Sequence, residues 1–230
     1  MIRLSTSALS TLGKKILMGL SGLFLSGFIV VHLIGNIALF YPDKDPFNKY
    51  AHFLMSLGGL LYLAELILAA LFLGHFIYAI MVTWQNWSSG KPGRYAVVTN
   101  QGHPSRKTWA STTMIYTGII IMVFLVLHLL HFKYGPVIMY TTKDGMYIRD
   151  LYTLVHQFYS NIWNALFYMV VMVLLGFHLS HGFWSAFQSL GISHPVYTPL
   201  LYGLGYLFAI IMGFGFFVIP VWSYFTGGAL

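Results

Sequence analysis

Four long apolar stretches of this 230-residue chain each contain a histidine deep inside a segment that should lie in hydrocarbon. These residues are His32, His75, His128 and His178. An imidazole is costly in a bilayer and is a common metal ligand, so histidines at this depth indicate a functional site. The alternative, that each is a hydrogen-bonded core residue, fits one such histidine better than four on four spans.

The composition indicates an integral membrane protein. Apolar residues make up 58% of the chain and charged residues only 7%, a ratio that soluble domains of this size do not show. Five apolar runs are each long enough to cross roughly 30 Å of hydrocarbon. The predicted spans are residues 17–41, 57–84, 109–132, 162–187 and 200–225. We therefore expect one all-α domain, residues 1–230, whose first span is too long for a removable signal peptide.

The lysines and arginines favour a cytoplasmic N-terminus. The N-terminal side of the bundle carries seven of them: Arg3, Lys14, Lys15, Lys91, Arg94, Arg106 and Lys107. The opposite side carries five: Lys44, Lys49, Lys133, Lys143 and Arg149. By the positive-inside rule the N-terminal side is predicted to be cytoplasmic. Its basic character fits either anionic lipid headgroups or a docked soluble partner.

The chain contains no cysteine, which excludes an iron–sulfur cluster, covalently attached c-type haem and disulfides on this subunit. The longest connections, near residues 85–108 and 133–161, are only loop-sized. We expect no nucleotide or flavin domain and no nucleic-acid partner. Chemistry on a water-soluble substrate must then take place on another subunit.

Position along the spans groups the four histidines into two level pairs. His75 and His178 lie roughly 15 Å from the inner ends of their helices, and His32 and His128 roughly 10–14 Å from the outer ends. Haem iron that only transfers electrons takes two axial imidazoles, because no position is then open for another ligand. The spacing therefore predicts two b-type haems at two levels of the membrane, the outer one between His32 and His128.

Two of the spans contain a second histidine three residues further on, at His131 and His181. Both lie closer to the membrane surface and match the depth of a partner less well, so we expect them to bind a haem propionate, water or quinone. Ser26, Ser180 and Tyr62 are candidates for hydrogen bonds to the second nitrogens of the ligand rings. The remaining histidines, His52, His103, His156 and His194, are expected to be mostly polar surface residues.

Four segments of the sequence carry a resemblance to a known family. Residues 28–36, 65–75, 118–128 and 178–185 resemble, in order and spacing, the five-helix di-haem cytochrome b subunit of succinate:quinone oxidoreductases. These are the succinate dehydrogenases and fumarate reductases (complex II) that use menaquinone. The resemblance covers the first four spans and implies that His32 and His128 hold the distal haem, and that the other pair holds the proximal haem.

The family resemblance also implies a location and partners. It implies a bacterial inner membrane, an iron–sulfur subunit on the cytoplasmic face, and a flavoprotein subunit that carries the dicarboxylate chemistry. Electrons would pass between the iron–sulfur subunit, the two haems and menaquinone in the membrane. A higher oligomer of the whole complex is compatible with this assignment.

Quinone chemistry takes up or releases protons, which directs attention to the few polar residues near the spans. Glu65 is the sole carboxylate in any predicted span and is a candidate for quinone proton transfer. A protonated acid bonded to a neighbouring helix is the alternative. Tyr50 and His52, near the outer mouth of the second span, are further quinone candidates.

On the inner side, the basic and aromatic residues before the third span are candidates for binding haem propionates. These are Arg106, Lys107 and Trp109, for which anchoring at the membrane surface is the alternative.

Three other functions stay open at this point. The chain could be a proton-coupled transporter with a histidine relay, the di-haem anchor of another quinone-linked oxidoreductase, or a structural anchor with vestigial histidines.

Overall fold

The computed structural model describes residues 10–88 and 108–226. Within these ranges five helices are long and apolar enough to cross a membrane, so the chain is a multi-pass membrane protein, as predicted. Arg106 and Lys107, predicted to contact a propionate, and His103 lie outside the described residues. The spanning helices are α2 (Thr11–Asn36), α4 (Gly59–Ser88), α5 (Trp109–His128), α7 (Ile162–Ser189) and α8 (Thr198–Thr226).

Two of these helices continue in a different helical form. α2 passes into the 3₁₀ helix Ile37–Phe40, and α5 passes into the π-helical segment η2 (Leu129–Lys133). α2 begins at Thr11 rather than at Leu17, because Ser10 caps the helix by accepting a hydrogen bond from the backbone N–H of Gly13 at 3.0 Å. Lys14 and Lys15 therefore belong to the spanning helix itself and not to a separate surface helix.

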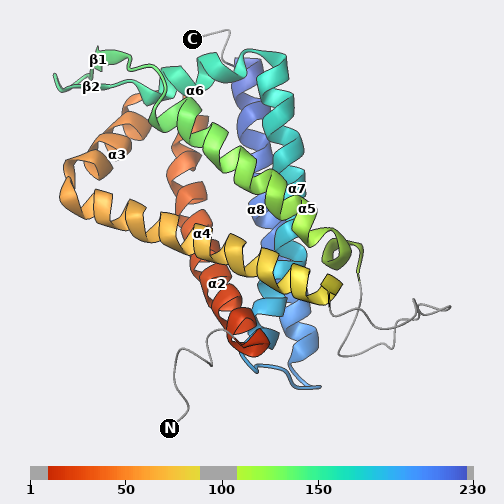
Figure 1. The fold of residues 1–230 in the computed structure, drawn as a ribbon. Coiled ribbons are helices and arrows are strands. Elements are labelled where there is room, and N and C mark those ends of the chain that lie inside the picture. The colour runs from red at the N-terminus through yellow and green to blue at the C-terminus, as the bar shows by residue number, and fades with distance from the viewer. Residues whose placement is uncertain (1–9, 89–107, 227–230) are drawn as a thin grey trace.

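The helices do not form an even bundle (Figure 1). α7 and α8 lie side by side along most of their length, while α4 crosses α2 at a steep angle. A Cβ atom built on Gly213 of α8 would lie 3.1 Å from the Cα atom of Gly176 on α7, so this close packing favours glycine at position 213. α2 also packs on α7, and α7 on α5, whereas α4 and α5 barely touch each other.

The two ends of the bundle differ. We call the end where α2 begins the N-side and the opposite end the hairpin side. The hairpin side is covered by α3 (Asp45–Ser56), the antiparallel pair β1 (Met139–Thr141) and β2 (Tyr147–Arg149), and α6 (Leu151–Tyr159). Gly145, in the turn of the hairpin, has a φ of 87°, which glycine adopts without strain.

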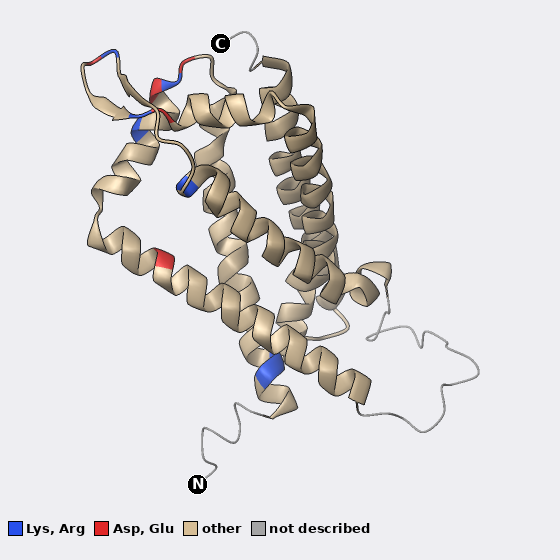
Figure 2. Ribbon diagram, turned by 45° about the horizontal axis from the view of Figure 1, so that its top comes forward, with Lys and Arg blue, Asp and Glu red and all other residues tan. Residues whose placement is uncertain are grey.

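Charged residues gather at the ends of the bundle and are nearly absent from the helices between them (Figure 2). On the hairpin side Asp150 is almost fully buried and accepts four hydrogen bonds. Their donors are Lys44 Nζ at 2.6 Å, Asn48 Nδ2 at 2.9 Å, and the N–H and hydroxyl of Thr153 at 3.0 and 2.8 Å. These bonds join α3 to the start of α6. The cover, by which we mean α3, the β hairpin and α6, is therefore held by a polar network and not by apolar packing alone.

The network determines how Asp150 ionises. Burial opposes the charged form of Asp150, but the hydrogen bonds from Lys44, Thr153 and Asn48 outweigh it and hold the pKa of this carboxyl below its usual value. Asp144 in the hairpin has a pKa of about 2, because Thr142 and Lys49 donate hydrogen bonds to its carboxylate. Unlike Asp150, Asp144 is largely exposed, so its ion pair is screened by solvent.

One sequence interpretation is wrong on this side of the molecule. His156 of α6 was expected at the surface, but it is only 2% exposed and packs against Tyr152, with ring centroids 4.2 Å apart and the rings tilted. Its position between two spans suggested exposure, whereas the amphipathic α6 turns this face toward α8.

The buried carboxylate makes the cover sensitive to pH and to substitution. We expect Asp150→Asn to lower the free energy of unfolding by roughly 3 kcal/mol, because it removes charge-assisted hydrogen bonds in a buried site. A group with a lowered folded-state pKa stabilises the fold above about pH 4 and loses that contribution as the pH falls further. Thermal unfolding in detergent, followed above and below about pH 4, measures both the effect of the substitution and the effect of pH.

Asp144→Asn is the matched control for Asp150→Asn. It should cost much less stability, since Asp144 is exposed. Equal losses in the two variants would show that the buried network does not hold the cover.

Candidate functional site

The structure brings the four spanning histidines together in the two pairs that depth predicts. His32 of α2 faces His128 at the end of α5, with ring centroids 5.8 Å apart. His75 of α4 faces His178 of α7, with ring centroids 6.4 Å apart. The first pair lies toward the hairpin side and the second toward the N-side. Each pair joins two helices that are distant in sequence.

These separations suit two imidazoles that share one metal ion. Two metal–nitrogen bonds of about 2 Å, with the distance of about 1 Å from each nitrogen to its ring centre, put the centroids roughly 6 Å apart. No group of three or more histidine or carboxylate side chains suited to a metal lies among the described residues. A macrocycle that supplies four nitrogens of its own requires only two protein ligands, so a pair suffices for haem.

The N-side pair has its second ring nitrogens fixed by hydrogen bonds. Nδ1 of His75 lies 3.0 Å from the carbonyl oxygen of Met18 and 3.3 Å from the hydroxyl of Ser21, both on α2. Nδ1 of His178 lies 3.1 Å from the hydroxyl of Thr117 on α5. Both hydroxyls are within donor distance of backbone carbonyls of their own helices.

These partners select the tautomer of each ring. A carbonyl oxygen can only accept, and a hydroxyl that donates to its own helix is left as an acceptor. Nδ1 therefore carries the proton in His75, and Thr117 can accept a hydrogen bond from Nδ1 of His178 in the same way, which leaves the lone pair on Nε2. This is the form in which histidine binds a metal ion through Nε2, with the other nitrogen held by a neighbouring group.

A glycine follows each of the two hydroxyl residues and lies beside the same histidine. A Cβ atom on Gly22 would lie 3.1 Å from Cε1 of His75, and one on Gly118 would lie 3.6 Å from Cε1 of His178. The sequences Ser21-Gly22 and Thr117-Gly118 thus play matching roles on opposite sides of the pair. The hydroxyl orients the ring, and at Gly22 the missing side chain leaves room for His75, whereas a side chain at Gly118 would make an ordinary contact with His178.

The hairpin-side pair is surrounded by aromatic rings instead of hydroxyls. His32 stacks on Phe28 with centroids 5.4 Å apart, and Phe124 and Phe132 lie 5.6 and 5.3 Å from His128. Nδ1 of His128 is buried and has no hydrogen-bond partner among the described residues. A buried nitrogen of this kind requires an explanation, and a bound group or water near the ring would supply one.

The second histidines point to different neighbours. His131 of η2 lies within hydrogen-bond distance, 3.0 Å, of the hydroxyl of Tyr168 on α7. The ring of His181 meets Trp184 edge-on at 5.0 Å, and its Nδ1 is buried without a partner in the described parts of the chain. Neither ring takes the place of His128 or His178 in a facing pair, although their roles toward propionate or quinone stay predictions.

Glu65 has a partner that the sequence did not indicate. Its carboxylate forms an ion pair with the ammonium group of Lys133, at the end of η2. The interpretation as an acid bonded to a neighbouring helix is therefore right about the contact, but the partner is a cation. About one third of each side chain is exposed.

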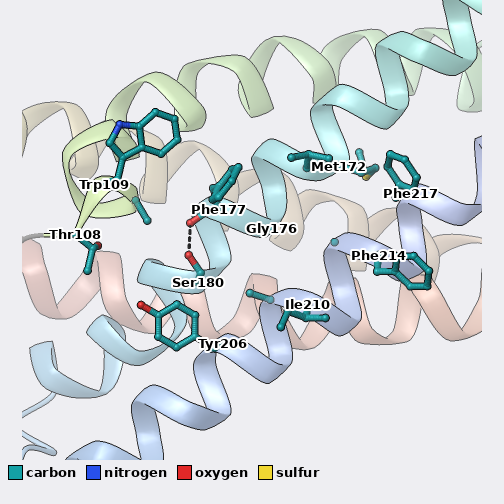
Figure 3. Close-up of a pocket in the computed structure, with 14 residues that line it drawn as sticks. Thr108, Trp109, Met172, Gly176, Phe177, Ser180, Tyr206, Ile210, Phe214 and Phe217 are labelled. Carbon is teal, nitrogen blue, oxygen red and sulfur yellow. Dashed lines mark hydrogen bonds between the residues drawn. The ribbon is translucent and has the colours of Figure 1, made fainter.

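Trp109 does not lie against the N-side histidines. Its indole meets Phe177 edge-on at 5.8 Å and lines a groove of about 570 Å³ between the start of α5, α7 and α8. Figure 3 shows Trp109, Phe177 and Tyr206 around one end of this groove and Phe214 and Phe217 at the other. An indole placed this way is typical of a membrane-surface anchor, the alternative proposed for Trp109.

The two further quinone candidates lie on α3. Tyr50 packs over Gly35 of α2, where an added Cβ would lie 2.6 Å from Cε1 of the tyrosine ring, and His52 is exposed. No contact of either residue with the histidine pairs is evident in the described residues. Their roles stay predictions.

Hydroxyl groups do bond to the second nitrogens of two histidine rings, but they do not come from the three residues that the sequence suggested. Ser26 and Ser180 donate to carbonyls of their own helices, and Tyr62 is largely exposed. Ser21 and Thr117 are the hydroxyls that reach the rings. A search for a hydroxyl residue at the same depth on an adjacent span would have found them.

Comparison of the chain with protein-family models, with curated proteins and with solved structures finds no match. The function is therefore argued from the geometry of the site and from the residues themselves.

The tautomer argument gives a direct test. We expect Thr117→Val, which has nearly the same shape as the wild type, to remove the acceptor of Nδ1 in His178 and leave His75 unchanged. Nitrogen NMR of ¹⁵N-histidine-labelled protein should show a change in the ring signals of His178 and none in those of His75. Ser185→Ala is the control, because Ser185 lies in α7, the helix of His178, and its hydroxyl bonds to its own helix. An unaltered His178 signal in Thr117→Val would contradict the proposed hydrogen bond.

Proposed function

We propose that this chain is the di-haem cytochrome b subunit and membrane anchor of a succinate:quinone oxidoreductase. One observation carries the proposal: four helices present two facing imidazole pairs at two depths, with separations suited to one metal ion each. The resemblance of the first four spans to the cytochrome b family favours a succinate-linked complex over other quinone-linked complexes. Under this proposal the N-side faces the bacterial cytoplasm, where the flavoprotein and iron–sulfur subunits bind.

The residues of each pair hold one haem b by axial coordination. His75 and His178 would bind the inner haem, and His32 and His128 the outer haem. Haem iron supplies reversible one-electron transfer, and two axial imidazoles leave no position for oxygen or substrate. The hydrogen bonds to Ser21 and Thr117 keep Nε2 of the inner ligands available, so the protein orients the ligands before the cofactor binds.

The two levels suggest a path for electrons across the membrane, in either direction. The histidine levels differ by about 10 Å along the bundle, so under this proposal the two haems would lie in series between the cytoplasmic partner and the hairpin side. Quinone, expected to be menaquinone, would react near the outer haem, with Glu65 as the acid or base that exchanges its proton. This chain itself carries out no dicarboxylate chemistry.

The competing functions use the same histidines differently. A proton relay requires rings that can accept on one nitrogen and donate on the other in turn, whereas Nδ1 of His75 faces a carbonyl that only accepts. Di-haem anchors of other quinone-linked enzymes would share the facing pairs. They are distinguished from the succinate-linked class by copurification of the soluble subunits.

Substituting the histidines singly and in combination tests whether each facing pair holds one haem. The purified protein should bind two haems per chain, and His75→Ala and His178→Ala should each lose the same one. The double variant of these two should lose no more than either single variant, whereas His32→Ala with His75→Ala should lose both haems. Absorbance of the reduced protein and a redox titration measure the loss.

His194→Ala is the control, because His194 stacks on Tyr197 outside the spans. A colourless wild-type protein would contradict the proposal and favour the transporter. If substitution of each of the four histidines caused a haem loss independent of the other three, the pairing would be contradicted.

A further inference from the structure

The groove of about 570 Å³ lies where the start of α5 meets α7 and α8. In the described part of the chain α5 packs against α7, with the indole of Trp109 edge-on to the ring of Phe177, but it does not pack closely on α8. α7 and α8 approach each other closely at Gly176 and Gly213, and both glycines line the groove. The groove is therefore the space that remains where α5 crosses the pair formed by α7 and α8.

The two ends of the groove differ in chemistry. Trp109 and Tyr206 bring an indole N–H and a hydroxyl group to one end, whereas Met172, Phe214 and Phe217 line the other (Figure 3). α7 ends and α8 begins on the N-side, so the polar end points toward the N-side surface. A ligand that matches the groove has polar atoms at its N-side end and hydrocarbon along the rest.

The donors at the polar end have no acceptor of their own. Neither the indole N–H of Trp109 nor the hydroxyl of Tyr206 has a hydrogen-bond partner within residues 10–88 and 108–226. Their side chains are accessible, because Trp109 is 72% and Tyr206 47% exposed. Tyr206 lies roughly 12 Å from the N-side end of α8, a depth at which an unpaired donor is costly. Both groups therefore call for a ligand with oxygen atoms that accept hydrogen bonds.

The size of the groove excludes another helix as its occupant. The segment of α8 from Tyr206 to Phe217 is roughly 16 Å long, about half of the hydrocarbon thickness of the membrane. A helix is about 10–12 Å across with its side chains, so the same length of helix would fill more than about 1,000 Å³. The groove, at about 570 Å³, is too narrow for a helix and has the size of a site for a small ligand.

We propose that the groove binds one acyl chain of a diacyl phospholipid from the N-side leaflet. The indole N–H of Trp109 and the hydroxyl of Tyr206 donate hydrogen bonds to the ester carbonyl oxygens, which can only accept. The chain then lies along Phe214 and Phe217 toward the middle of the bundle. A lipid in this place fills the space between α5 and α8. The site makes no use of the haems and is independent of the proposed function.

The charge of the sequence near this end favours an anionic head group. The connection that precedes α5 contains four cations and no acid: Lys91, Arg94, Arg106 and Lys107. Basic segments next to membrane spans attract anionic lipids of the cytoplasmic leaflet. Phosphatidylglycerol is therefore the lipid with which to test the site.

The test uses the full-length protein in detergent, titrated with dioleoyl phosphatidylglycerol, and native mass spectrometry to count the lipids bound to each chain. The wild-type protein should bind one lipid before any other site fills. Val173→Trp and Ile210→Trp, which fill the groove from α7 and from α8, should each weaken this binding at least tenfold. Both residues line the groove and are exposed, so a larger side chain does not disturb the core.

Val170→Trp and Ile211→Trp are the matched controls. Val170 and Ile211 are exposed on the same two helices, but they do not line the groove. The two control variants should therefore bind the lipid as the wild-type protein does.

A second comparison tests the hydrogen bonds to the lipid. Tyr206→Phe should weaken binding of the ester lipid about fivefold, the effect of losing one hydrogen bond. The dialkyl ether analogue of the same lipid has no ester carbonyls, so the wild-type protein and Tyr206→Phe should bind it equally well. A fivefold difference for the ether lipid as well would contradict the assigned hydrogen bond.

Equal lipid affinity of the wild-type protein and both groove-filling variants would overturn the inference, as would an equal loss in the two controls. A dimer that the groove-filling variants abolish, with the bound lipid retained, would instead assign the groove to a second copy of the chain. The haem content is read from the same spectra and does not enter the comparison, so a failure of this inference is distinct from a failure of the proposed function.

Discussion

A buried imidazole needs a partner for each of its two nitrogens, and this requirement organises the bundle. On the N-side, α2 and α5 supply the partners of Nδ1, and α4 and α7 carry the rings. The two rings then face each other across the pair, with centroids 6.4 Å apart. Four helices must therefore keep one relative position for these requirements to be met together. The close contact of His75 with Gly22 follows from the same constraint.

The two pairs differ in how the protein surrounds them. Hydroxyl groups orient the N-side rings, whereas aromatic rings pack around His32 and His128. Aromatic packing restricts a ring through its shape and leaves its nitrogens without fixed donors or acceptors. The hairpin-side pair also lies near the polar residues Glu65 and Lys133 and under the cover formed by α3, the hairpin and α6. This end of the molecule thus combines the histidine pair with groups able to exchange protons, while the N-side pair is enclosed among helices.

Much of this arrangement could be predicted from the sequence, and the failures have identifiable causes. Apolar length is sufficient to find the five spans, and counting residues from the span ends gives the depth of each histidine and hence the pairs. Depth does not give the direction of a side chain around its helix, so the hydroxyl partners of the rings were missed. The ion pair of Glu65 was missed because Lys133 depends on a π turn, which a regular α-helical period does not predict. His156 was misplaced because loop length says little about whether a short helix packs inward.

The central claim is that each facing pair of imidazoles holds one iron atom. Low-temperature electron paramagnetic resonance of the oxidised, purified protein tests it most directly, because the signal depends on the axial ligands of ferric haem. The account predicts two low-spin signals typical of bis-imidazole coordination, one lost in His178→Ala and the other in His128→Ala. A high-spin signal from five-coordinate iron, a single low-spin signal, or no haem signal in the wild type would contradict it.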